Sequence, residues 1–230
     1  MDKVVNVKEI SKETRDPSII MKAYNELAPG ESIELINDHE PRPLLAKFQA
    51  EHAGEFEWWP LEQGPETWRI RIKKRDTAIP ERTITDFFQS DHRRLDEIFR
   101  AFTDEVEGKR WEDALRHIKE FSLGLKNHIQ AEEEILFPAF EQKTGMFGGG
   151  PTQVMRMEHV DIREFLDRAV KATADRDEAA VEEARSALVT YLLDHNMKEE
   201  NILYPESDSF LEDSERADIM LKAQRVSPGD

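Results

Sequence analysis

The sequence predicts an α+β chain of two domains, a small β-α-β-α-β-β two-layer sandwich followed by an up-down-up-down four-helix bundle. Three observations support this prediction. Residues 1–75 alternate short strand-like and helix-like segments, whereas every segment of residues 83–230 has the apolar spacing of an amphipathic helix. Charges and a proline without periodicity follow Lys73, and we place a linker at residues 76–82. A repeat with an offset of 67 positions within the second part indicates one helical hairpin present twice.

In the first domain, residues that favour turns delimit each element. Pro29-Gly30 ends the first helix, and Pro41 lies in the first turn of the second. The expected order is strand 4–7, helix 17–27, strand 32–36, helix 41–52, and a hairpin of strands 56–61 and 68–72.

Two groups of side chains in the first domain have alternative interpretations. Trp58, Trp59 and Trp68 are expected in the core, and otherwise on a face that docks onto the bundle. The segment 37–43 and His52 could form a second metal site. A strand-to-helix turn in which Asn37 or Asp38 caps the helix is the favoured interpretation.

In the second domain, glycine and proline separate long amphipathic helices. Gly108 ends the first helix, a glycine-rich loop follows the second, and Pro151 opens the third. The fourth helix is expected to end near Pro205. The expected helices are 85–106, 111–143, 151 to about 172, 178–204 and a short tail helix 214–225.

The repeat preserves polar residues within apolar helices. The pattern H-x-x-x-E-E-x-I-L-[F/Y]-P begins at His128 and again at His195, and the same offset relates His92 to His159. Residues i and i+4 differ by only about 40° around a helix, so each histidine shares a face with its glutamate. In an up-down-up-down bundle these helix segments reach one level of the interior. The predicted metal ligands are His92, His128, Glu132, His159, His195 and Glu199.

The ligand types limit the choice of metal. Imidazole and carboxylate together suit iron, manganese or zinc, and the chain contains no cysteine that could supply a thiolate. A single ion would leave buried charged ligands unused, at a cost in free energy. The pattern therefore indicates a pair of ions.

These residues resemble those of the hemerythrin family, specifically its HHE cation-binding branch, over residues 83–205. The resemblance implies two iron ions with oxo or hydroxo and carboxylate bridges, for which manganese or zinc could substitute. The first domain resembles an uncharacterised family of small α/β domains that are sometimes fused to such bundles. Its fold is similar to that of small sulfur carriers, but without cysteine a sulfur relay is excluded.

The chain departs from the oxygen-carrying hemerythrins, which have two histidines one turn apart on the third helix. Here Met155 precedes His159 by four positions and Arg163 follows it by four. This departure makes reversible oxygen storage a weaker expectation than ligand binding or oxidation. Arg163 is expected to form a surface ion pair with Asp167.

Three other polar residues are candidates for roles near the metals, and a fourth, His117, is not. Asp96, one turn after His92, is an optional ligand. Glu133 and Glu200 are expected to orient histidine rings rather than to ligate. His117 lies roughly 16 Å before His128 along the same helix and is expected to take no part in the site.

Composition limits the partners. A formal net charge of −17 argues against nucleic acid and anionic membranes, which both attract basic surfaces. No run of about eighteen apolar residues or secretory signal is found, which favours a cytoplasmic protein. A homodimer or a protein partner could form through the α/β domain.

The preferred function is a di-iron protein that binds oxygen or nitric oxide, or that senses iron or redox state. The alternatives are a di-iron enzyme or iron–sulfur repair factor, and an iron storage or trafficking protein. Repair factors that resemble this bundle usually carry a short cysteine-bearing leader, which this sequence lacks. Whether the chain is an enzyme stays open, although no constellation for hydrolysis accompanies the six ligands.

Overall fold

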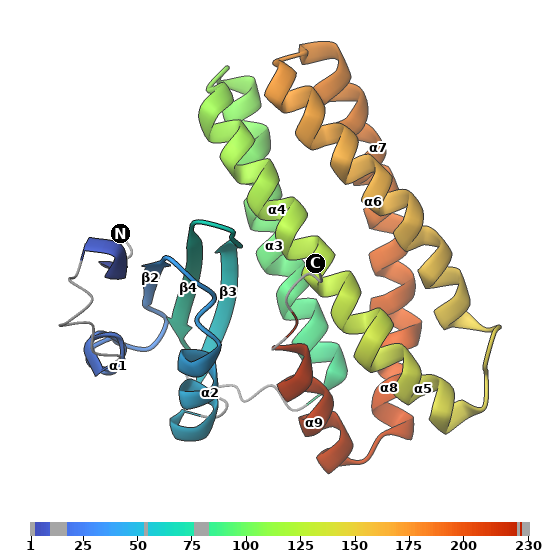
Figure 1. Cartoon of the computed structure of the whole chain (residues 1–230). Coiled ribbons are helices and arrows are strands. Elements are labelled where there is room, and N and C mark those ends of the chain that lie inside the picture. Colours follow the sequence, from blue (N-terminus) through green and yellow to red (C-terminus); the bar gives the residue numbers. More distant parts are fainter. Residues whose placement is uncertain (1–2, 10–17, 53–54, 76–82, 225, 227–230) are drawn as a thin grey trace. The chain divides into compact units, whose positions relative to one another are not determined.

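The computed structural model describes residues 3–9, 18–52, 55–75, 83–224 and 226. The chain divides into two compact units, residues 1–80 and 81–230 (Figure 1). Among the described residues, no helix combines the length and the apolar character needed to cross a bilayer.

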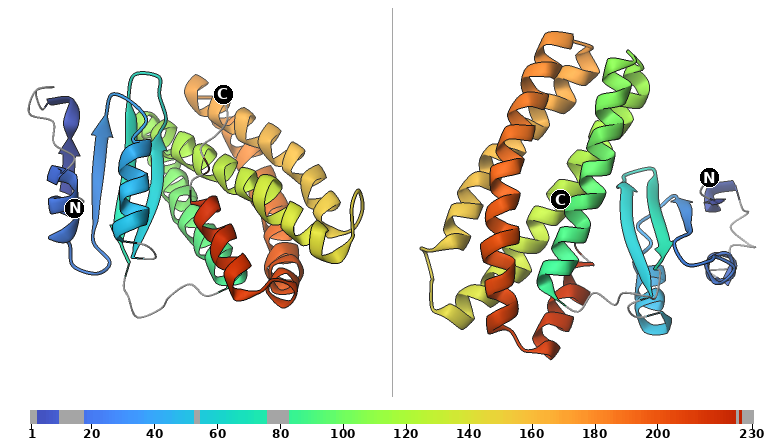
Figure 2. Two further views of the ribbon diagram at one scale, coloured as in Figure 1. Left: turned by 60° about the horizontal axis from the view of Figure 1, so that its bottom comes forward. Right: turned by 180° about the vertical axis from the view of Figure 1, so that it is seen from behind.

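The first unit has the predicted α/β order. Its elements are β1 (Lys3–Asn6), a 3-10 turn (Val7–Glu9), α1 (Ser18–Asn25), β2 (Ser32–Asn37), α2 (Arg42–Glu51), β3 (Phe56–Glu62) and β4 (Trp68–Lys74). The sheet order is β1-β2-β4-β3, in which β1 runs parallel to β2 and the other neighbours are antiparallel (Figure 2). The predicted fold class is confirmed, but β4 includes Lys73 and Lys74, so the charged run begins within the sheet.

Alternate residues of the strands fill the core of this unit. Ile33 pairs with Ile72 and Leu35 with Ile70 across β2 and β4, and all four side chains are buried. Period-two burial of this kind fixes the register, because a slip by one residue would expose every one of these side chains.

The tryptophan prediction is only partly right. Trp58 lies in this core, whereas Trp59 and Trp68 are half-buried and lie outside the cluster. Of the three indoles, only that of Trp58 belongs to the core. The strand conformation of β3 and β4 therefore follows from their alternating apolar residues.

The suggested second metal site is not formed by the described residues of this unit. His39 pairs with Asp38 at 2.7 Å, and His52 pairs with Glu55 at 3.0 Å. No group of three ligand atoms assembles among them. The predicted cap is also wrong, because Pro41 occupies the N-cap position of α2, and Asn37 instead donates to the carbonyl of His39.

The second unit is a bundle of four long helices with a short helix after them. Its elements are α3 (Ile84–Glu107), α4 (Trp111–Ala131), α5 (Phe137–Thr144), α6 (Pro151–Asp175), α7 (Glu178–Lys198), α8 (Tyr204–Phe210) and α9 (Asp213–Ala223). The hairpin α3–α4 lies beside the hairpin α6–α7 (Figures 1 and 2). The predicted bundle is confirmed.

Two π-helical turns interrupt the second and fourth long helices at equivalent places. Residues Glu132–Leu136 join α4 to α5, and residues Glu199–Leu203 join α7 to α8. Each proline that follows occupies the first turn of the next helix, where a missing N–H is tolerated. The prediction that the fourth helix ends near Pro205 is therefore wrong, since the helical path continues to Phe210.

The polar level of the bundle lies between two apolar layers. On one side, a cluster includes Leu95, Leu125 and Ile162. On the other, a cluster includes Phe88 and Leu203. These layers keep water away from the level between them, and polar groups buried there need partners.

Asp208 fixes the start of α3 from the end of α8. Its carboxylate accepts hydrogen bonds from the backbone N–H groups of Ile84 at 2.6 Å and Thr85 at 3.0 Å, and from the Thr85 hydroxyl at 2.7 Å. A carboxylate at a helix N-terminus satisfies free N–H groups and interacts favourably with the helix dipole.

We expect Asp208→Ala to lower the free energy of unfolding by about 1–3 kcal/mol, because these partly buried donors lose their acceptor. Urea denaturation of the full chain followed by circular dichroism measures the change. Asp208→Asn keeps an acceptor oxygen and should lose less. Equal losses in both variants would show that charge alone accounts for the effect.

Candidate metal centre

The six predicted ligands meet inside the bundle. His92 comes from α3, His128 from α4, His159 from α6 and His195 from α7, while Glu132 and Glu199 open the two π-helical turns. None of these six residues is more than 4% exposed. Long helices with apolar residues above and below thus position six polar side chains that the sequence separates widely.

The histidines form two pairs. The Nε2 atoms of His92 and His128 are 3.0 Å apart, and those of His159 and His195 are 3.2 Å apart. Each pair joins two neighbouring helices of one hairpin. The site therefore has two halves, one from each copy of the repeat.

Glu199 reaches both halves. Its Oε2 lies 3.5 Å from Nε2 of His92, and its Oε1 lies 3.1 Å from Nε2 of His195. Its two oxygens thus belong to two candidate sets of metal ligands. One set is His92, His128 and Glu199, and the other is Glu132, His159, His195 and Glu199; the ligand atoms within each set lie within 4.8 Å of one another.

Glu132 is arranged differently from its repeat partner. Its Oε2 lies 3.4 Å from Nε2 of His159 and 3.7 Å from Nε2 of His128. Its Oε1 accepts a hydrogen bond of 2.7 Å from the hydroxyl of Tyr204. Only one oxygen of Glu132 therefore faces the histidines.

A carboxylate orients each histidine ring through its Nδ1 atom. Within each hairpin, Nδ1 of His128 is 2.9 Å from Asp91, and Nδ1 of His195 is 2.9 Å from Glu158. A carboxylate accepts but does not donate, so Nδ1 carries the proton and Nε2 keeps its lone pair for a metal.

The other two contacts cross between the hairpins. Nδ1 of His92 is 2.7 Å from Glu200, and Nδ1 of His159 is 2.9 Å from Glu133. Both glutamates directly follow a candidate ligand in sequence. They hold rings rather than facing the Nε2 atoms, as the sequence predicts.

Neighbouring arginines and histidines keep the carboxylates that orient the imidazoles ionised. Burial raises the pKa of Asp91, but Arg94 and His128 more than offset this and place it well below its usual range. Burial likewise raises the pKa of Glu133, whereas hydrogen bonds from His159 and Arg163 bring it to about 2. Both groups are therefore negatively charged at neutral pH.

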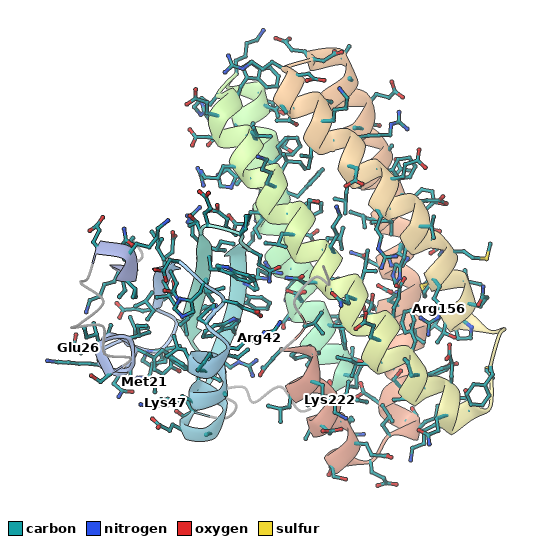
Figure 3. All side chains as sticks on the ribbon, in the orientation of Figure 1. Met21, Glu26, Arg42, Lys47, Arg156 and Lys222 are labelled. Atoms are coloured by element: carbon teal, nitrogen blue, oxygen red, sulfur yellow. The ribbon has the colours of Figure 1, made fainter. Side chains whose placement is uncertain are left out.

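The predicted role of Arg163 is wrong. Its guanidinium binds Glu133 with contacts of 3.1 and 2.7 Å, while Asp167 pairs with Lys126. Arg156, labelled in Figure 3, also reaches this region from α6 and donates to the backbone carbonyl of Glu133 at 3.0 Å. These two arginines fix the glutamate that orients His159.

Two residues considered in the sequence lie outside the centre. His117 on α4 is half-buried, and burial lowers its pKa. Asp96 on α3 is exposed and belongs to neither set of candidate ligands.

Sequence reasoning missed Tyr204. Its side chain is fully buried, and its hydroxyl lies 3.1 Å from Oε2 of Glu199, 3.3 Å from Nε2 of His128 and 3.4 Å from Nε2 of His92. The signal was present, because Tyr204 occupies the [F/Y] position of the repeated pattern. In an α-helix a residue five positions after Glu199 would point elsewhere. The π turn, in which the N–H of Tyr204 donates to the carbonyl of Glu199, brings the two together.

The donor set fits metal ions. Glu132 Oε2 and Glu199 Oε1 are buried and accept no hydrogen bond. Burial raises the pKa of Glu199, but the neighbouring imidazoles of His195 and His159 hold it well below its usual range, so the group is ionised. A buried carboxylate oxygen without a partner costs roughly several kcal/mol of folding free energy. Imidazole nitrogens face the same space, so the carboxylates and imidazoles together form a site for a cation.

We expect Asp91→Asn and Glu158→Gln to weaken metal affinity by about 10–100-fold while the fold is retained, because each removes the anion that orients one histidine. Competition with a chromophoric chelator measures the affinity. Glu164→Gln, an exposed site on α6, serves as the control. An unchanged affinity in both variants would mean that these carboxylates do not support metal binding.

A four-helix bundle that carries two sets of buried histidine and glutamate ligands defines a dinuclear metal-binding helical protein. The family described as the hemerythrin HHE cation binding domain matches residues 83–207, more than half of the chain. The chain belongs to this family. Residues 4–74 match a family described as an uncharacterized conserved protein, DUF2249.

Curated relatives are similar over part of the chain. Proteins named iron-sulfur cluster repair protein YtfE from Enterobacter sp. (strain 638), Escherichia coli (strain K12 / DH10B) and Shigella boydii serotype 18 are 34% identical to it over 90 residues. The match covers 35% of this chain and 40% of each relative. No solved structure matches the chain significantly.

Proposed function

We propose that this chain is a non-haem di-iron protein that binds a small diatomic ligand, oxygen or nitric oxide. His92, His128 and Glu199 would hold one iron, and Glu132, His159, His195 and Glu199 the other. The observation that carries the proposal is the position of Glu199, whose two oxygens face the two histidine pairs. Iron, rather than manganese or zinc, is favoured by the family to which the bundle belongs.

The ligand count supports binding of an exogenous molecule. The two sets provide three and four protein ligand atoms, fewer than the six of an octahedral ion. Iron in such a centre supplies open coordination positions and electrons for binding a diatomic molecule. The protein contributes orientation of the imidazoles through Nδ1, exclusion of water by apolar layers, and a buried hydroxyl that contacts ligands of both sets.

Anaerobic purification followed by metal analysis and separate titrations with oxygen and nitric oxide tests the proposal. We expect about two irons per chain and a spectral change that saturates at one ligand per centre. A stoichiometry of one iron, or tight zinc without iron uptake under reducing conditions, would contradict the dinuclear iron site. Turnover of many equivalents of ligand would make the protein an enzyme instead.

A second function, repair of damaged iron–sulfur clusters, is favoured by the similarity to proteins named for that activity. The test mixes iron-loaded protein with a [4Fe–4S] enzyme whose cluster has been damaged by nitric oxide and follows recovery of its activity. Recovery beyond that given by free ferrous iron would support repair. Recovery equal to that of free iron would leave ligand binding as the function.

The α/β unit offers no assembled group of metal ligands among its described residues, and we propose that it binds a protein partner or a second copy of the chain. Size-exclusion chromatography with light scattering, before and after addition of ligand, tests whether association changes with the state of the metal centre.

A further inference from the structure

The two halves of the centre differ at one pair of repeat-related residues. Tyr204 beside His92 corresponds to Phe137 beside His159, 67 positions earlier. The rings occupy similar places, since the centroids of Tyr204 and His92 are 5.9 Å apart and those of Phe137 and His159 are 5.8 Å apart. A single hydroxyl thus distinguishes the halves at this place.

The hydroxyl faces the half with fewer protein ligands, through contacts with His92 and His128, and it also touches Glu132 of the other half. His92, His128 and Glu199 make a set of two histidines and one carboxylate, an arrangement that leaves coordination positions open on iron. The other half adds Glu132 to its two histidines and to Glu199. An exogenous ligand is therefore expected on the half beside Tyr204.

The contacts of the hydroxyl show where its proton can go. It lies within 3.4 Å of both Nε2 atoms of this set and 3.1 Å from Oε2 of Glu199, so it faces the same space as all three ligands. It donates at 2.7 Å to Glu132, and a rotation about the C–O bond redirects its proton toward a molecule in that space. The ring of Phe88 stacks on the ring of Tyr204, with centroids 5.2 Å apart, and helps to keep the phenol in place.

We infer that Tyr204 determines ligand affinity, by donating a hydrogen bond to a small anionic ligand held on the His92–His128 side of the centre. The inference rests on the proposed di-iron function. Phe137 has no proton to give, so the other half lacks this recognition. The residue is a specificity determinant that contacts the ligand, and iron retention does not depend on it.

Azide is the probe, and the experiment uses the full-length ferric protein. We expect Tyr204→Phe to retain two irons and to bind azide about tenfold or more weakly, because a hydrogen bond to a charged group is lost. Phe137→Tyr is the matched control and should leave azide affinity unchanged. The double variant, which moves the hydroxyl to the other half, should remain weak.

A measurement on the unmodified protein makes the test independent of variant folding. The antisymmetric stretch of bound azide should shift when water is replaced by deuterium oxide, since the donated proton exchanges. An unshifted band, or an azide affinity in Tyr204→Phe within about twofold of the original, would overturn the inference. Resonance Raman bands of an iron-bound tyrosinate would also overturn it, because a coordinated phenolate has no proton to donate.

Failure of the proposed function gives a different result. If the unmodified protein holds two irons but takes up none of azide, nitric oxide and oxygen, small-ligand binding itself is wrong. If it binds azide and Tyr204→Phe binds it equally well, only the role of Tyr204 is wrong.

Discussion

Glu199→Ala is expected to abolish binding of the iron pair. Glu199 is the residue shared by both candidate sets, so its removal takes a ligand from each ion at once. His128→Ala and His195→Ala each remove one ligand from one set and should lose at least one iron. Iron per folded chain, measured by inductively coupled plasma mass spectrometry after desalting, should fall from about two to below one in Glu199→Ala.

The matched control is His117→Ala, on the same helix as His128 but outside both sets. It should keep the iron content of the original chain. Circular dichroism establishes that each variant is folded. Loss of iron from a folded His117→Ala variant, or a normal iron content in Glu199→Ala, would contradict the ligand assignment.

Removal of metal is expected to lower the melting temperature of the bundle strongly. A ligand present at 100 times its Kd stabilises the native state by about 2.7 kcal/mol per site, which corresponds to roughly 5–10 °C for a domain of this size. The unmetallated site also leaves buried carboxylate oxygens without hydrogen bonds. Scanning calorimetry of the full chain, with and without prior chelation, measures the shift.

Glu199→Ala provides the control for this experiment, because chelation should not change its melting temperature further. His117→Ala should show the same shift as the original chain. Equal melting of metal-loaded and chelated protein would mean that the ligands bind no metal in the folded state, or that the site is open to water.

Much of the centre was predictable because helix geometry is simple. A spacing of four residues places each glutamate on the same helix face as its histidine. The common repeat offset places His92 and His159 at the same level of the bundle. The carboxylates beside the ligands were also predictable, since Glu133 and Glu200 accompany ligands in both copies. Which ring each of them orients depends on the packing of one hairpin against the other, which local spacing does not specify.

The π-helical turns were not predictable in this way. Pro205 is a helix-stopping signal in an α-helical interpretation, and the predicted end of the fourth helix follows from it, whereas the predicted second helix 111–143 passes through Pro138. Because of the wider turn, each proline lies in the first turn of the next helix, and Tyr204 lies beside Glu199. Proline as a helix break is a local inference, and the altered hydrogen-bond register overrides it.

The contacts from Glu200 to His92 and from Glu133 to His159 cross between the two hairpins, and they are related to each other as the contacts between two identical subunits are. Exchange of the hairpins maps each contact onto the other, as a twofold axis does in an isologous dimer. One hairpin alone has half of the centre and lacks the carboxylate for one of its own rings, so it could complete the centre only by pairing with a copy of itself. The bundle is in this sense a dimer within one polypeptide. Because the two copies are joined in one chain, the sequence of each copy can change independently of the other. Phe137 in the first copy and Tyr204 in the second are equivalent positions at which the copies differ.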